Sequence, residues 1–356
     1  MKHLRIAFLD SWLQQAVDGS GTAAAIGGLA TTLRRRGHQI DRIAPASNEP
    51  LTLRRLRYNW ELPSRLQTAA YDLIVGFDID GVRLAGRAGG RYVCSIKGVI
   101  AEEQRHERGL MRALLWSLSR IERINARRAP LVITTSEYCR RMISAHYGVP
   151  GARIGIVPEG IDVAAWQGLA ASAERDGWTV LCVARQYPRK HIADLIQAFV
   201  AVVAAFPQAQ LIVVGDGPEH DSLRALVRTL RLEASVRLLG ALPDDAEVRR
   251  WYGRAAVFCL PSVQEGFGIV FLEAMAGGLP IVSTSAAAIP EVVPQRQAGT
   301  LVPPGDVAAL SAALTELLGD PALRERYSAF GRQHVRQYDW ERVADRFLEV
   351  VGVSGQ

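Results

Sequence analysis

The sequence predicts an α/β protein of two domains, each built around a parallel β-sheet, and three observations support this prediction. The chain has 356 residues, which exceeds one ordinary domain and suits two of about 150 residues, each able to bury its own core. Short apolar segments alternate with longer amphipathic ones, a pattern typical of βαβ units. A stretch of small, polar and mixed residues at 158–176 separates two groups of such segments.

The expected strands follow the apolar segments. In the first group they cover 3–9, 72–77, 92–96 and 131–135, and in the second 179–184, 211–215, 236–239, 257–260 and 281–283. Helices are expected between them, one ending at Arg36 and others at 110–128, 191–206 and 269–276. This order places the helices as crossovers between parallel strands.

The most informative segment is EGFGIVFLEAMAGGLPIV, residues 265–282. A strand ends just before it, a glycine loop follows, and a helix then begins at Ile269 without a breaker. The backbone N–H groups of such a loop and of a helix start suit an anion such as a diphosphate. The residues expected to present these groups are Gly266, Phe267, Gly268, Ile269 and Val270.

Two carboxylates bracket this loop and helix. Glu265 precedes the helix and Glu273 lies one turn into it, so the two can have different roles, one toward a sugar and the other toward a ribose. Carboxylates accept hydrogen bonds from hydroxyl groups well.

A cationic counterpart follows an earlier strand of the same group. Arg185 and Lys190 come after the strand at 179–184, and the carboxyl ends of strands are where open α/β sheets bind ligands. Breaking a glycosyl phosphate bond builds negative charge on the leaving oxygen, which fixed cations stabilise. Such a site requires no metal.

The sequence resembles the retaining glycosyltransferases of family 4, also called group 1, over nearly its whole length. The segments that carry the likeness are ARQYPRKHIADLIQAF, QAQLIVVGDGPEHDSL, VRLLGALPDD, EGFGIVFLEAMAGGLPIVSTSAAAIPEVV and GTLVPPGDVAAL, in the family's order and spacing. The resemblance implies the GT-B fold, in which two Rossmann-like domains face a central cleft. The acceptor domain would cover 1–162, the nucleotide-sugar donor domain 163–337, and a last helix within 338–356 would cross back onto the first domain.

The resemblance also implies roles for individual residues. Arg185 and Lys190 would contact the donor diphosphate, Glu273 the ribose and Glu265 the donor sugar. The nucleotide base would lie near Leu239, Gly240 and Ala241.

The first half resembles the family more loosely. Ser20-Gly21 stands in place of a glycine pair, with Gly21 as the expected contact, and Ala184 replaces a glycine. Lys97 follows the strand at 92–96 where many members have a histidine that touches the transferred sugar. Lys97 is either a cationic substitute or the mark of a subgroup with another sugar or acceptor geometry. Glu159 stands where asparagine is common.

Basic charge is concentrated in the first domain. Residues 1–150 carry a net charge of +10 and the remainder −4. In the helix at 110–128, one face holds a tryptophan among arginines (Arg112, Trp116, Arg120, Arg123, Arg127) and the other is apolar (Met111, Leu114, Leu115, Leu118, Ile121). The polar face is either an ordinary solvated surface or a contact with anionic lipid headgroups. No nucleic-acid motif or interleaved aromatic pattern is present.

Other features exclude further classes. No signal peptide or membrane-spanning segment is visible, so the cytoplasm is expected, with peripheral membrane association as an option. The four cysteines are scattered and the seven histidines show no metal spacing, so we expect no metal or other cofactor. Asp78-Ile79-Asp80 matches the DxD metal motif of the unrelated GT-A transferases, but that fold would not explain the second sheet and its cations.

We therefore expect an enzyme that moves a hexose from a nucleoside diphosphate sugar, UDP- or GDP-linked, to a hydroxyl of a glycan, lipid-linked or polysaccharide acceptor. Two rivals remain. The same fold serves nucleotide-sugar epimerases and hydrolases, which consume donor without an acceptor, and a non-catalytic nucleotide-sugar binding protein would bind without turnover.

Overall fold

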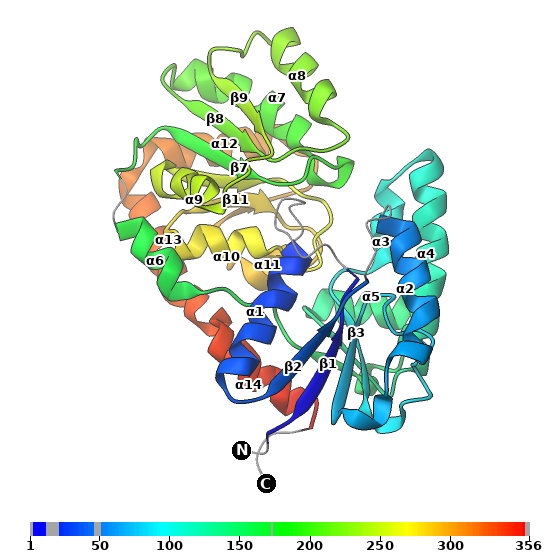
Figure 1. Ribbon diagram of the computed structural model, residues 1–356. Helices are drawn as coiled ribbons and strands as arrows, with labels where there is room; N and C mark the ends of the chain where they lie inside the picture. Colours follow the sequence, from blue (N-terminus) through cyan, green and yellow to red (C-terminus); the bar gives the residue numbers. More distant parts are fainter. Residues whose placement is uncertain (1–2, 12–20, 46–50, 172–173, 353–356) are drawn as a thin grey trace. The chain divides into compact units, whose positions relative to one another are not determined.

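The computed structural model describes residues 3–11, 21–45, 51–171 and 174–352 and divides the chain into two compact units. Unit 1 comprises Met1–Gly160 and Trp340–Gln356, and unit 2 comprises Ile161–Asp339. The sequence analysis placed these boundaries two residues away, after 162 and 337. Each unit is an α/β layer structure (Figure 1).

Unit 1 contains a six-stranded parallel sheet in the order β2-β1-β3-β4-β5-β6. Its strands are β1 (Arg5–Leu9), β2 (Gln39–Ile43), β3 (Leu73–Phe77), β4 (Tyr92–Ile96), β5 (Leu131–Thr134) and β6 (Ile154–Ile156). Its helices are α1 (Gly21–Arg35), α2 (Leu51–Arg65), α3 (Ile100–Glu103), α4 (Gly109–Arg128), α5 (Glu137–Tyr147) and α14 (Trp340–Val350).

The alternation of side chains along β1 explains the two helical layers of unit 1. Ile6 and Phe8 belong to a core that includes residues of α1 and α14. Ala7 and Leu9 point the other way and join a core that includes residues of α2, α4 and α5. The sheet is therefore buried on both faces, as parallel sheets require.

The last helix belongs to the first unit, which confirms the predicted return of the chain. Trp340 of α14 lies against Gly28 of α1 and Gly160, where an added Cβ would come within 2.3 Å of its ring. Arg36 donates to the carboxylates of Glu341 and Asp345 at 2.8 and 2.6 Å. Close packing and ion pairs together hold α14 to α1.

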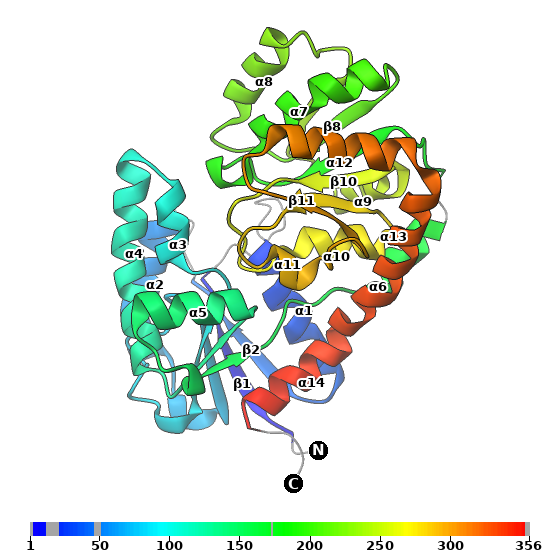
Figure 2. The same cartoon turned by 180° about the vertical axis from the view of Figure 1, so that it is seen from behind.

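Unit 2 contains a second six-stranded parallel sheet, in the order β12-β11-β10-β7-β8-β9. Its strands are β7 (Thr179–Val183), β8 (Gln210–Val214), β9 (Val236–Gly240), β10 (Val257–Leu260), β11 (Ile281–Thr284) and β12 (Gly299–Val302). Its helices are α6 (Val163–Ala171), α7 (Ile192–Ala205), α8 (His220–Thr229), α9 (Asp245–Arg254), α10 (Ile269–Ala276), α11 (Ile289–Val292), α12 (Val307–Gly319) and α13 (Pro321–His334). Figure 2 shows the same elements from behind.

The apolar face predicted for the helix at 110–128 is buried unevenly in α4: Met111 is 46% exposed, whereas Leu118 on the same face is buried. The first turns of α4 extend past the ends of the strands (Figure 1). Within the described ranges, no helix is both long enough and apolar enough to cross a bilayer.

Candidate active site

Two neighbouring strands of unit 2 bring a predicted cation and a predicted carboxylate together. β7 and β10 pair in parallel, so the loops after them leave the same edge of the sheet. Lys190 Nζ, after β7, donates to Glu265 Oε1, after β10, at 2.5 Å. The two side chains are only 13% and 11% exposed, so their attraction is screened less than that of a surface pair.

Neighbouring groups hold this pair in place. Ser262 Oγ donates to Glu265 Oε1 at 2.8 Å, and the backbone N–H of Val263 donates to the carbonyl of Arg189 at 2.9 Å, which ties the two loops. Arg185 also leaves the carboxyl end of β7 and lies on the surface, with its guanidinium 5.7 Å from the centre of the Tyr187 ring.

The loop from Glu265 leads into α10 through a glycine that no other residue could replace without strain. Gly268 has a φ of 92°, and a Cβ on it would lie 2.5 Å from the Phe271 ring. No side chain caps the start of α10, so its first N–H groups, at the partly exposed Ile269 and Val270, suit an anion. Phe267 packs against Tyr338 in the core, so only its backbone can face a ligand.

Glu273 occupies a different environment from Glu265. Tyr252 Oη donates to Glu273 Oε2 at 2.7 Å, and burial raises the pKa of the Glu273 carboxyl. The Tyr252 ring is itself fixed, because it stacks on Phe258 and meets Trp166 edge-on. The two carboxylates that the sequence singled out are thus held by separate partners, which fits separate roles.

The expected base-binding residues lie farther along the same edge. Leu239 and Gly240 end β9, which pairs with β8, the neighbour of β7. Both line an open pocket of about 500 Å³ between β9 and α8. Basic side chains from α8, those of His220, Arg224 and Arg228, line the same pocket.

The remaining predicted residues belong to unit 1. Gly21 is the exposed first residue of α1, while Gly19 and Ser20 fall outside the described residues. Lys97 follows β4, and its Nζ donates to Glu159 Oε2 at 3.1 Å. The two side chains are 10% and 5% exposed. The structure therefore pairs the two positions at which this chain carries unusual charged residues.

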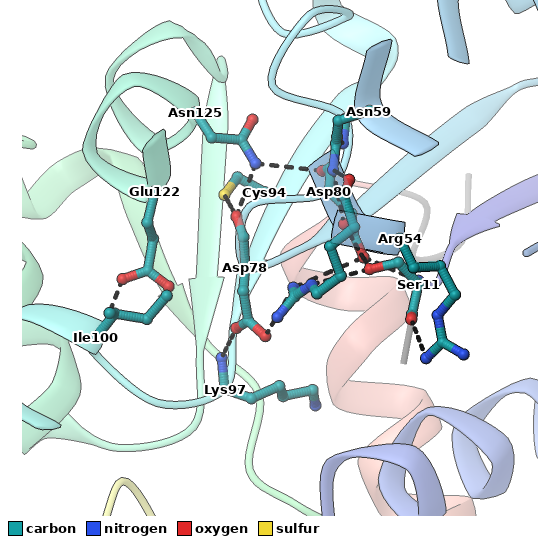
Figure 3. A network of polar contacts seen from close by, with 12 residues as sticks. Ser11, Arg54, Asn59, Asp78, Asp80, Cys94, Lys97, Ile100, Glu122 and Asn125 are labelled. Carbon is teal, nitrogen blue, oxygen red and sulfur yellow. Dashed lines mark hydrogen bonds and ion pairs between the residues drawn. The ribbon is translucent and has the colours of Figure 1, made fainter. Parts of the chain in front are cut away.

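Asp78 and Asp80, which match a metal-binding motif, form a buried network instead (Figure 3). Asp78 Oδ1 accepts from the backbone N–H of Lys97 at 3.1 Å. Asp80 accepts from Ser11 and from Asn59. Burial raises the pKa of Asp78 to about 6 and also raises that of Asp80. Across the described ranges, no group of three or more His, Cys, Asp or Glu side chains is arranged to hold a metal ion.

Sequence reasoning missed three polar partners at these sites. Ser262 and Tyr252 hold the two carboxylates of unit 2, and Glu159 holds Lys97. The position of Ser262, three residues before Glu265 at the end of a strand, is the one local signal. The other two partners lie 21 and 62 residues away from the groups they hold, so no spacing rule reveals them.

Family models match both halves of the chain. Residues 170–334 match "Glycosyl transferases group 1", and residues 19–165 match "Glycosyltransferase Family 4". The two matches correspond closely to units 2 and 1.

Curated relatives lead to the same family. A phosphatidyl-myo-inositol mannosyltransferase of Mycobacterium leprae is 38% identical over 63% of this chain and 60% of its own length. A GDP-mannose-dependent monoacylated alpha-(1-6)-phosphatidylinositol monomannoside mannosyltransferase of Corynebacterium glutamicum is 31% identical over 75% of this chain and 73% of its own. The aligned part thus spans about 60% of the first of these relatives.

Solved structures share the fold. Sucrose-phosphate synthase from Thermosynechococcus elongatus superposes with a TM-score of 0.76 at 22% identity, covering 97% of this chain and 98% of that one. WaaG, a glycosyltransferase involved in lipopolysaccharide biosynthesis, gives 0.76 at 18% identity, covering 99% and 100%. The predicted fold and family are confirmed: the chain belongs to the group 1, family 4 glycosyltransferases and has their GT-B fold.

Proposed function

We propose that the chain transfers a hexose from a nucleoside diphosphate sugar to a hydroxyl group, with retention at the anomeric carbon and without a metal. The observation that carries this proposal is the shielded pair of Lys190 and Glu265 at the uncapped start of α10. A cation, free N–H groups and a carboxylate in one place match the diphosphate and the sugar of such a donor.

The ion pair suggests how the donor binds. The Lys190 ammonium has three N–H donors, one of which Glu265 now accepts. A diphosphate carries more negative charge than one carboxylate and competes for the ammonium, so binding would turn Glu265 toward the sugar hydroxyls. Ser262, which also donates to Glu265, keeps the carboxylate near its present position.

The same residues then serve the chemical step. As the glycosyl phosphate bond breaks, negative charge grows on the leaving oxygen, and Lys190, Arg185 and the N–H groups of α10 stabilise it. Glu265 orients the sugar and stabilises the positive charge of the oxocarbenium-like state. A front-side route, in which the leaving phosphate takes the acceptor proton, needs no base from the protein.

The donor and acceptor are proposed from two sources. The relatives are named as mannosyltransferases, one of them GDP-mannose-dependent, so GDP-mannose is the first donor to test and a UDP-sugar the second. The net charge of +10 in residues 1–150 favours an anionic, lipid-linked acceptor at the cytoplasmic face of a membrane.

The variant Glu265→Gln tests the proposed chemistry. Turnover of the donor should fall by about 100-fold or more, because a stabilising charge is lost at the reacting centre, while nucleotide affinity changes only a few-fold. Steady-state kinetics and nucleotide titration measure the two quantities. Glu316→Gln, a surface carboxylate of the same unit paired with Arg296, is the matched control.

Product analysis separates the rivals. Transfer to an added acceptor supports the proposal, and it should persist when a metal chelator is present. Donor that is epimerised or hydrolysed without acceptor, or bound without any turnover, would refute it. Equal losses of turnover and affinity in Glu265→Gln would refute the role given to that carboxylate.

A further inference from the structure

Nearly all of the exposed large apolar side chains lie on two helices of unit 1. Seven of the eight such residues in the described part of the chain lie on α2 or α4. They are Leu53, Leu56, Trp60, Leu110, Met111, Trp116 and Ile124, and the eighth is Val200 on α7. Single exposed apolar residues are ordinary, whereas a concentration of this kind marks an interaction surface.

The two helices are neighbours that project from one end of the sheet. Both contribute to the core on the same face of unit 1. Asn59 of α2 and Asn125 of α4 both hydrogen-bond to Asp80, just beyond the carboxyl end of β3. The residues of α4 before Asn125 span about 24 Å at 1.5 Å per residue, and the first turns of this helix extend past the strands. Figures 1 and 2 show this projection of α4.

Each of the two exposed tryptophans has an arginine guanidinium beside its ring. The guanidinium of Arg83 lies 4.3 Å from the Trp60 ring centre, and that of Arg120 lies 4.5 Å from the Trp116 ring centre. Trp60 is 72% exposed and Trp116 52%. Tryptophan with a cation beside it suits the headgroup layer of a bilayer, where an apolar ring and a charge are both accommodated.

The exposed charges of α4 are all positive. The helix carries five arginines, and its single acid, Glu122, is fully buried. Near its start, Gly109, Arg112, Ala113 and Trp116 line an open hollow of about 410 Å³. Arginine binds phosphate oxygens through paired N–H groups, so this surface complements an anionic phosphate layer.

We propose that the exposed faces of α2 and α4 form a docking surface for an anionic lipid bilayer. The residues Leu110, Trp116 and Trp60 enter the headgroup layer, and Arg112 and Arg120 contact lipid phosphates. The surface extends beyond the carboxyl edge of the unit 1 sheet, where α/β proteins bind their ligands. This inference deepens the proposed lipid-linked acceptor and rests on it, since docking would bring that acceptor to the enzyme.

Vesicle flotation with the full-length protein tests the proposal. We expect binding to phosphatidylcholine vesicles that contain phosphatidylglycerol, little binding to pure phosphatidylcholine, and weakening by salt. The double variants Leu110→Ser/Trp116→Ser and Arg112→Glu/Arg120→Glu should each reduce binding by about 10-fold or more. Val200→Ser removes an exposed apolar side chain outside the surface and should bind like the unaltered protein.

A second readout reports insertion itself. Brominated acyl chains should quench part of the tryptophan fluorescence, and Trp60→Phe/Trp116→Phe should lose that quenching while it keeps its melting temperature. Absence of binding to anionic vesicles would overturn the proposal. Binding by both surface variants that equals that of the unaltered protein would also overturn it. So would dimerisation without lipid that the same variants abolish, because a second copy would then be the occupant.

Nucleotide binding, measured in the same proteins, distinguishes failure of the proposed function from failure of the docking surface. Stabilisation by a nucleoside diphosphate depends on unit 2, and none of the substituted residues lies there except the control Val200. Vesicle binding without nucleotide stabilisation would refute the proposed function and support the docking surface. Nucleotide stabilisation without vesicle binding would support the proposed function and refute the docking surface.

Discussion

Arginine supplies 39 of the 42 basic residues, and lysine occurs only at Lys2, Lys97 and Lys190. The two lysines within the described ranges follow strands at the carboxyl edges of two different sheets, and each is paired with a glutamate. A compact ammonium has three rotatable donors and acts as a point charge, unlike the planar guanidinium. A chain that otherwise uses arginine thus places lysine at the two edges where ligands are expected.

The pairing of Lys97 with Glu159 predicts that their substitutions are coupled. Lys97→Met or Glu159→Gln alone leaves one buried charge without its partner and should cost about 3–5 kcal/mol of stability. The double variant, with no charge left, should cost much less than the sum. Thermal unfolding of the four proteins measures this, and strictly additive losses would show that the two residues act independently.

Glu122 predicts a dependence of stability on pH. Burial, and then the charge of Asp78, raises the pKa of Glu122 well above its usual value. The folded protein therefore keeps a proton that the unfolded chain releases, so stability falls as pH rises from the unfolded pKa toward the folded one. Glu122→Gln keeps an acceptor for Tyr147 and Ile100, which now donate to this carboxylate.

Glu122→Gln should raise the melting temperature at pH 8 and change it little at pH 5, because glutamine does not titrate. Thermal scans at the two pH values provide the measurement. An equal change at both would mean that Glu122 is ionised in the folded protein.

At the scale of elements, the packing of α14 on α1 depends on glycine. A methyl group on Gly28 would lie 2.3 Å from the Trp340 ring, so Gly28→Ala should cost about 1–3 kcal/mol despite the better helix propensity of alanine. A Cβ added at Gly168 in α6 would meet no atom within 4 Å, so Gly168→Ala should gain about 0.5–1 kcal/mol. Melting temperatures that move in the same direction would contradict this packing.

Apolar pattern predicted the central strands better than the outer ones. The three strands that the sequence analysis omitted, β2, β6 and β12, each lie at an edge of a sheet. β2 reads QIDRI and β6 has only three residues. Edge strands are packed on fewer sides, so they need less apolar sequence to form. Helix α10, in contrast, begins and ends where the sequence placed it, at Ile269–Ala276.

Local order explains which parts of the site could be predicted. A strand, a glycine turn and a helix within about 20 residues fix the position of Glu265 relative to α10, and the parallel sheet brings Lys190 beside it. The partners of Lys97 and Glu273 depend on packing between distant segments, which one sequence does not reveal. Residues 12–20 lie outside the described residues, so Ser20 of the Ser20-Gly21 pair is not described, whereas Gly21 is.

At the scale of the molecule, charge and chemistry are divided between the units. Residues 1–150 carry a net charge of +10 and the remainder −4, and the exposed apolar side chains gather on unit 1. Unit 2 holds the Lys190 and Glu265 pair. This division fits a protein in which one unit meets an anionic acceptor and the other binds the donor.

We expect unit 2 to bind a nucleoside diphosphate through Lys190. The melting temperature of the purified protein with UDP, GDP or ADP tests this binding, since a ligand at 100 times its Kd stabilises the folded state by about 2.7 kcal/mol. We expect one nucleotide to raise the melting temperature, Lys190→Ala to lose that rise, and Arg189→Ala, which removes the adjacent cation stacked on Tyr187, to keep it. No rise with any of the three nucleotides, or an equal rise in Lys190→Ala, would show that unit 2 does not bind a nucleoside diphosphate through Lys190.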